Sequence, residues 1–132
     1  MEDSTAKADP EKKLEQKARA RWVAEAALDL KAQKLVALDV SELTSYTDTL
    51  VLATGTSDRH ARAIADAIKE AATARGEKPL GVEGYDDGRW VLIDLGDVVV
   101  HVFQSEVRDT YDFERLWSDA SPIDLSSLAA SA

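Results

Sequence analysis

Residues 89–103 read RWVLIDLGDVVVHVF, and this stretch decides how the rest of the chain is interpreted. Apolar residues alternate with other residues on both sides of Leu95-Gly96, a pattern typical of two antiparallel strands joined by a tight turn. The stretch therefore predicts a β-hairpin with one arm at Arg89–Ile93 and the other at Asp97–Phe103.

The turn length sets the pairing of the two arms, and the pairing sets their faces. A two-residue turn places Trp90 opposite His101, and side chains then alternate between the two faces of the sheet. One face is wholly aliphatic, so it is predicted to pack against the helices as a core face. Its residues are Val91, Ile93, Val98, Val100 and Val102.

The second face of the hairpin mixes aromatic, aliphatic and charged residues and is neither a clean core nor a clean solvent face. Its composition resembles the centre of a protein interface with a polar rim, so we expect it to bind a macromolecular partner. The alternative is that a helix not evident from the sequence covers it. The residues of this face are Trp90, Leu92, Asp94, Asp97, Val99, His101 and Phe103.

The N-terminal half predicts a long helix followed by two buried strands. Apolar residues recur every four positions between Glu11 and Gln33, which indicates a helix with one apolar stripe. Short apolar runs at 34–40 and 49–54 suit buried strands, separated by a loop rich in Ser and Thr. The stripe of the helix consists of Leu14, Ala18, Trp22, Ala26 and Leu30.

A second helix has clear boundaries. Ser57 is a favourable N-cap, Asp58 suits the positive start of the helix, and Gly76 ends it in the usual C-cap role. Residues 79–83 form a weak strand candidate, and residues 112–118 predict a last short helix. The apolar stripe of the second helix is predicted as Ala61, Ile64, Ala65, Ile68 and Ala72.

The predicted order of elements is α-β-β-α-β-β-β-α, which gives an α/β fold with a mixed sheet and helices mainly on one face. We expect a mobile N-terminal tail at residues 1–10, a single α/β domain at 11–118 and a flexible C-terminal tail at 119–132. The length of 132 residues suits one such domain.

Composition narrows the class of protein. The chain has 16 Lys and Arg against 25 Asp and Glu, a net charge of −9, whereas nucleic-acid binders usually carry a basic footprint. An acidic chain of this kind either uses its charge for solubility alone or is steered towards a basic partner, and we expect no DNA. Cysteine is absent, which excludes disulfides, and no apolar stretch approaches the length of a membrane span. The chain is predicted to be cytoplasmic, without contact to a membrane.

Gly55-Thr56-Ser57-Asp58 is the stretch closest to a catalytic motif. A strand-to-helix turn of this kind can hold an anion on backbone N–H groups, and it resembles the opening turn of nucleotidyltransferases. A nucleotide-binding or nucleotidyltransferase-type enzyme is therefore the alternative function. However, the next strand candidate lacks the carboxylate pair that holds Mg²⁺ in such enzymes, and neither His60 nor His101 has a nucleophile suggested beside it. We expect no catalytic residues, no metal and no cofactor.

Three groups of residues together resemble one family. They are Asp39-Val40-Ser41 with Thr47-Asp48 and residues 53–59, then Glu83-Gly84 with Trp90–Phe103, and then Arg108 with Tyr111–Trp117. Over residues 15–118 the chain is similar to the ribosomal silencing factor (Iojap-like) family of bacteria and organelles. It departs from the family pattern at Thr49 and Phe113.

The resemblance implies a nucleotidyltransferase-like fold without catalytic carboxylates, and a protein that is not an enzyme. It implies a translation repressor that binds the large ribosomal subunit through ribosomal protein number fourteen of that subunit and blocks association with the small subunit. The family's Trp, Asp, His, Arg and Tyr positions fall on Trp90, Asp94, His101, Arg108 and Tyr111. A homodimer seam on the same face is the open alternative. The predicted partner-binding residues are Trp90, Leu92, Asp94, Val99, His101, Phe103, Arg108 and Tyr111.

Overall fold

The computed structural model describes residues 10–126, which form a mixed α/β fold as predicted. The elements are helix α2 (Pro10–Asp29), strands β1 (Gln33–Asp39) and β2 (Thr49–Gly55), helix α3 (Asp58–Ala74), strands β3 (Gly81–Glu83), β4 (Trp90–Asp94) and β5 (Val98–Gln104), helices α4 (Ser105–Tyr111) and α5 (Phe113–Leu116), and strand β6 (Ser121–Pro122). Within these residues, no helix combines the length and apolarity needed to cross a bilayer.

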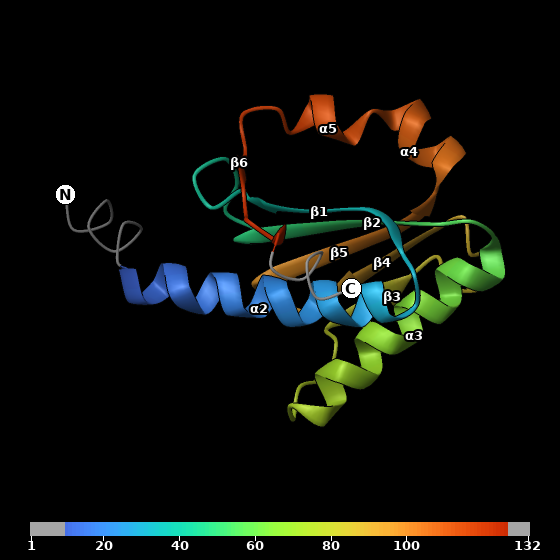
Figure 1. Cartoon of the computed structure of the whole chain (residues 1–132), viewed down its shortest axis with the longest axis horizontal. Helices are drawn as coiled ribbons and strands as arrows, with labels where there is room; N and C mark the ends of the chain where they lie inside the picture. Colours follow the sequence, from blue (N-terminus) through green and yellow to red (C-terminus); the bar gives the residue numbers. More distant parts are fainter. Residues whose placement is uncertain (1–9, 127–132) are drawn as a thin grey trace.

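The strands form one sheet in the order β3-β4-β5-β2-β1-β6. Strands β2 and β5 run parallel at its centre, and every other neighbouring pair is antiparallel. Helices α2 and α3 pack on one face, and α4 and α5 lie over the other (Figure 1). The two long helices therefore lie on one face, as expected, whereas the short α4 and α5 cover part of the second face, which is apolar enough to need a cover of its own.

Helix α2 packs through the predicted stripe only in its C-terminal half, where Ala26 is buried and Trp22 and Leu30 pack against the core. Its buried residues are Ala20, Val23, Ala24, Ala26 and Ala27, whereas Leu14 is 69% exposed. A strict four-residue spacing advances about 40° around the helix at each step, because one turn takes about 3.6 residues. The predicted stripe therefore winds off the sheet towards its N-terminal end.

Helix α3 begins and ends as the sequence predicts. The hydroxyl of Ser57 accepts a hydrogen bond from the backbone N–H of His60 at 3.0 Å, and Gly76 follows the last turn with a φ of +76°. The ring of His60 also donates from Nε2 to the carbonyl of Leu30 at 2.6 Å, which ties the start of α3 to the chain after α2. All of its predicted stripe residues are buried, namely Ala61, Ile64, Ala65, Ile68 and Ala72.

The hairpin of β4 and β5 is present, but its register differs by two residues from the predicted one. Trp90 lies opposite Phe103, and His101 lies opposite Leu92. The difference arises at the turn, where the backbone N–H of Leu95 donates to the carbonyl of Val98 at 2.9 Å and the connection is longer than two residues. Because the shift is an even number, every side chain in the strands stays on its predicted face.

After β5 the structure departs most from the predicted element order. The helix expected at 112–118 is present as the shorter α5, but it is preceded by α4, which was not predicted, and the two are separated at Asp112. Asp112 has a φ of +47°, a left-handed conformation that ends α4 and redirects the chain into α5. Local periodicity therefore indicated one helix where the backbone makes two.

Strand β6 lies within the segment that was expected to be a flexible tail. Ser121 and Pro122 pair with β1, and Ile123 and Leu125 pack against the core formed by α2, α3 and the sheet. A strand of two residues carries no periodicity that a sequence could reveal. The other expected tail residues, 1–9 and 127–132, lie outside the described part of the chain.

Candidate functional site

The second face of the hairpin continues across the sheet onto β2 and β1, and helices α4 and α5 cover this face over β5, β2 and β1. The alternative that an unassigned helix covers this face is therefore correct for its part on β5, where Val99, His101 and Phe103 are buried, and wrong for the rest. Helix α4 buries Val107 and Arg108, and helix α5 buries Phe113. The core cluster beneath them comprises Leu38, Val40, Leu50, Leu52, Val99, Phe103, Val107 and Phe113.

Arg108 fastens this cover to the sheet. Its side chain is 3% exposed and donates from Nη1 to the carbonyl of Lys34 at 2.5 Å and to Oγ1 of Thr54 at 2.9 Å. Its Nε donates to Oε2 of Glu114 at 2.9 Å, and this pairing lowers the pKa of the Glu114 carboxyl. Arg108 therefore joins β1, β2 and α5. Its burial does not support the prediction that Arg108 contacts a partner.

Lys34 takes part in this arrangement through its backbone. It has a φ of +47° and lies where the pairing of β1 with β2 is interrupted between Gln33 and Val36. Such a bulge leaves a carbonyl outside the ladder of strand hydrogen bonds. Here that carbonyl accepts from Arg108, so the irregular strand and the buried guanidinium satisfy each other.

Four of the eight predicted partner-binding residues are buried. Val99, His101, Phe103 and Arg108 are between 0% and 7% exposed. The other four reach the surface, because Trp90, Leu92 and Asp94 are half-buried and Tyr111 is 58% exposed. The sequence could not separate the two groups, since the separation depends on where α4 and α5 end. The accessible residues are Trp90, Leu92, Asp94 and Tyr111.

Trp90 is held in a cluster of aromatic rings. Its indole N–H donates to Nδ1 of His101 at 3.0 Å, and the rings of Tyr111 and Phe113 lie 5.1 and 5.3 Å from it between centroids. Burial lowers the pKa of His101 to about 4, so near pH 7 the ring is neutral and Nδ1 can accept this bond. The only polar atom of the indole is thus satisfied inside the protein.

A hollow of about 300 Å³ adjoins Trp90 at the β3 edge of the sheet and is lined by Glu83, Gly84, Trp90 and Leu92. Glu83 pairs with Leu92 across β3 and β4, so both side chains lie on the same face. The sequence contained Glu83-Gly84 among the residues shared with the family, but Glu83 was not assigned to the site. We term Glu83, Trp90, Leu92, Asp94 and Tyr111 the β4 surface.

The far end of the β4 surface meets the loop between β1 and β2. Oδ1 of Asp94 accepts from the backbone N–H of Gly96 at 2.8 Å, which fixes the carboxylate at the hairpin turn. Tyr46 is 56% exposed, and its pKa is raised by burial and by the nearby charge of Asp94. Sequence reasoning missed Tyr46 because a loop residue carries no periodicity that assigns it to a face.

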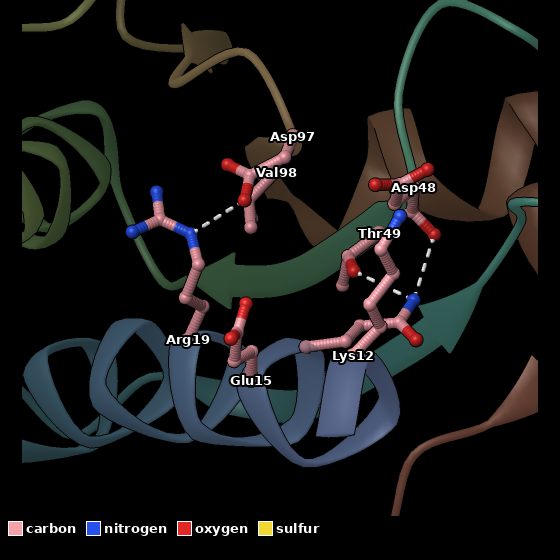
Figure 2. A pocket seen from close by; sticks show the side chains of 8 residues that line it. Lys12, Glu15, Arg19, Asp48, Thr49, Asp97 and Val98 are labelled. Atoms are coloured by element: carbon pink, nitrogen blue, oxygen red, sulfur yellow. Dashed lines mark hydrogen bonds and ion pairs between the residues drawn. The ribbon is translucent and has the colours of Figure 1, made fainter. Parts of the chain in front are cut away.

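A second hollow, of about 220 Å³, lies between α2 and the starts of β2 and β5, and several of its polar groups are paired with one another (Figure 2). Gln16 donates to the carbonyl of Asp48 and to Oγ1 of Thr49, each at 3.0 Å. Arg19 forms an ion pair with Asp97 at 2.8 Å and hydrogen bonds with Glu77 at 2.6 and 2.9 Å. These contacts join α2 to the strand ends, so the residues around this hollow have a structural role.

The turn at Gly55–Asp58 is closed by its own side chains. The backbone N–H of Thr56 donates to Nδ1 of His60 at 2.8 Å, and that of Arg59 donates to Oδ1 of Asp58 at 2.9 Å. With the N–H of His60 bonded to Ser57, three amides that an anion would use are already occupied. Within residues 10–126, no group of three or more His, Asp or Glu side chains is arranged to hold a metal ion.

Comparison with known proteins identifies the family. The family model described as ribosomal silencing factor during starvation matches residues 12–132. The Bacillus subtilis protein named ribosomal silencing factor RsfS is 41% identical over 112 residues, which cover 85% of this chain and 95% of that protein. A mouse protein named mitochondrial assembly of ribosomal large subunit protein 1 is 32% identical over 90 residues, which cover 66% of this chain and 40% of that protein.

The fold agrees with the sequence comparison. A crystal structure of a Chromobacterium violaceum protein matches with a TM-score of 0.73 at 39% identity, covering 79% of this chain and 85% of that one. The identity extends over most of both chains, and so does the arrangement of helices and strands. The chain therefore belongs to the ribosomal silencing factor family.

Proposed function

We propose that this protein is a translation repressor that binds the large ribosomal subunit through ribosomal protein number fourteen of that subunit and blocks association with the small subunit. The β4 surface is the observation that carries the proposal. It offers a half-buried Trp, a Leu and an exposed Tyr beside two carboxylates, which is the composition of an interface centre with a polar rim. The protein acts by binding, without a catalytic step.

The contact residues proposed here are those that solvent reaches. Trp90, Leu92, Asp94 and Tyr111 meet the partner directly, while the buried members of the earlier set hold the surface in shape from behind. The net charge of −9 favours a basic protein surface over bare RNA, because phosphates would be repelled. The large subunit is also part of the printed name of the mouse relative.

The test is co-sedimentation of purified large subunits with variants of the β4 surface. Trp90→Ala and Tyr111→Ala each weaken binding, and the double variant abolishes it, since a central aromatic residue commonly contributes about 2–4 kcal/mol to an interface. Tyr111→Ala is the safer single change because its side chain is exposed. The matched control is Leu14→Ala, which truncates an exposed apolar residue of α2 on the opposite face of the sheet.

A sucrose gradient of mixed subunits then measures the blocking step. The unaltered protein lowers the fraction of joined ribosomes, and the double variant does not. Full co-sedimentation of a folded Trp90→Ala, Tyr111→Ala variant would remove the β4 surface from the proposal. Binding without any decrease in joined ribosomes would contradict the blocking step alone.

A seam between two copies of this chain on the same surface is a second prediction, and a cytoplasmic location is a third. Sedimentation velocity at several concentrations measures the dimer. If Trp90→Ala abolishes concentration-dependent association, the seam and the ribosome contact use the same residues. The relation of the sheet to nucleotidyltransferases is also a prediction. Calorimetric titration with Mg-ATP tests whether a nucleotide site is retained, and we expect no heat of binding.

A further inference from the structure

The hollow at the β3 edge combines a carboxylate with an aromatic ring in a small space. Its volume of about 300 Å³ lies at the lower end of the range for ligand pockets, so it suits one side chain better than a whole small molecule. Glu83 is exposed and, among residues 10–126, no ion pair joins it to a cation. The carboxylate therefore has capacity for an incoming cation.

The orientation of Trp90 determines what the ring can offer. Because the indole N–H is bonded to Nδ1 of His101 at 3.0 Å, the ring contributes no polar donor to the hollow, only its π surface. Contacts with Tyr111 and Phe113 restrict the ring further. The π system of a ring held in this way can attract a flat cation through the ring quadrupole.

Gly84 brings the backbone close to Trp90 and closes one side of the hollow. It has a φ of +76°, and a Cβ atom at this position would lie 2.1 Å from the carbonyl oxygen of Trp90. The backbone of the β3–β4 connection therefore holds Glu83 at a fixed place relative to the indole. A preorganised site of this kind loses little conformational entropy on binding.

We propose that this hollow is a subsite for a single arginine side chain of the protein partner, with the guanidinium against Trp90 and hydrogen-bonded to Glu83. Arginine fits better than lysine because its planar fork can bind a carboxylate with two parallel hydrogen bonds while it stacks on an aromatic ring. The methylene stem of the arginine covers Leu92. This inference rests on the proposed function, because the hollow is part of the β4 surface that is proposed to bind the partner.

An NMR titration tests the subsite without the ribosome. The probe is the peptide acetyl-Gly-Arg-Gly-amide, added to the isotopically labelled full chain, and the signal followed is the indole N–H of Trp90. The indole signals of Trp22 and Trp117 serve as internal references. We expect a saturable shift of the Trp90 signal alone, and no shift with the matched peptide in which citrulline replaces arginine.

Variants then identify the residues that hold the guanidinium. Glu83→Gln weakens peptide binding by at least about fivefold, the change that corresponds to about 1 kcal/mol. Glu70→Gln removes an equally exposed carboxylate from α3, on the opposite face of the sheet, and leaves peptide binding unchanged. Equal binding of a lysine peptide would overturn the assignment to arginine, and an unperturbed Trp90 signal would overturn the subsite.

Co-sedimentation with large subunits separates this inference from the proposed function. If Glu83→Gln binds large subunits as well as the unaltered chain and the arginine peptide gives no shift, the subsite is wrong while the proposed function stands. If the peptide binds at Trp90 but the Trp90→Ala, Tyr111→Ala variant still co-sediments fully, the subsite stands and the proposed ribosome contact is wrong.

Discussion

Replacing Arg108 by Leu tests whether this residue holds the cover on the sheet. The substitution removes the donors of two acceptors, the part-buried carbonyl of Lys34 and the buried hydroxyl of Thr54. Each unsatisfied acceptor destabilises the folded chain by about 1–2 kcal/mol. Glu114 is 51% exposed and regains water, so losing its pairing adds only about 0.5 kcal/mol. We therefore expect Arg108→Leu to lower the free energy of unfolding by about 3 kcal/mol.

Urea unfolding followed by circular dichroism measures this change. The matched control is Arg115→Leu, which removes the same charge from an exposed position in α5 and is expected to change stability by no more than about 0.5 kcal/mol. If both variants are equally stable, Arg108 does not fasten the cover, and the structural interpretation fails.

A binding measurement distinguishes the two interpretations of Arg108. At a temperature where Arg108→Leu is still folded, the variant should co-sediment with large subunits like the unaltered protein, because the side chain lies behind the β4 surface. A variant with unchanged stability and lost binding would restore Arg108 as a direct contact.

Three further predictions follow from buried or strained positions. The folded-state pKa of His101, about 4, lies below its ordinary value of 6.5, so the stability it contributes is complete above pH 6.5 and falls by about 3 kcal/mol as the pH drops towards 4. His101→Phe should flatten that part of a pH profile of urea unfolding. An unchanged profile would contradict the burial of a neutral ring. Gly84→Ala and Gly76→Ala introduce a side chain at the same φ of +76°, but of these two only Gly84 faces a close backbone atom. Thermal unfolding should therefore show a stability lower by about 1 kcal/mol for Gly76→Ala and by clearly more for Gly84→Ala. Equal decreases would argue against the tight contact with Trp90. Ser57→Ala removes the bond to the N–H of His60 and should reduce the free energy of unfolding by about 1 kcal/mol, whereas Ser57→Asp, which can still cap the helix, should restore it.

The two faces of the hairpin could be predicted from the sequence even though the register could not. The period of side chains in a strand is two, so an error of two residues in the turn leaves every face assignment unchanged. Val91 and Val100 are buried on the core face, as expected, although they are not opposite each other. Turn geometry depends on hydrogen bonds such as that between Leu95 and Val98, which alternation does not encode.

The cover of the second face could not be predicted because its position is a tertiary property. Helix α4 is only seven residues long and ends at a left-handed Asp112, so no apolar stripe of helical length identifies it. The burial of Arg108 depends in turn on the irregular backbone at Lys34, which lies far away in the sequence. The sequence therefore predicted the face that carries the candidate site, but the accessible part of that face was recognised only from the structure.

The parallel pairing of β2 with β5 at the centre of the sheet has a consequence for how the chain is made. Strand β2 is synthesised before α3, β3 and β4, so it waits without its parallel partner until β5 has left the ribosome. Contacts between such distant segments slow folding, and exposed strand edges during the delay favour aggregation. During synthesis β2 can pair early only with β1, so its second edge stays open in the nascent chain until β5 arrives.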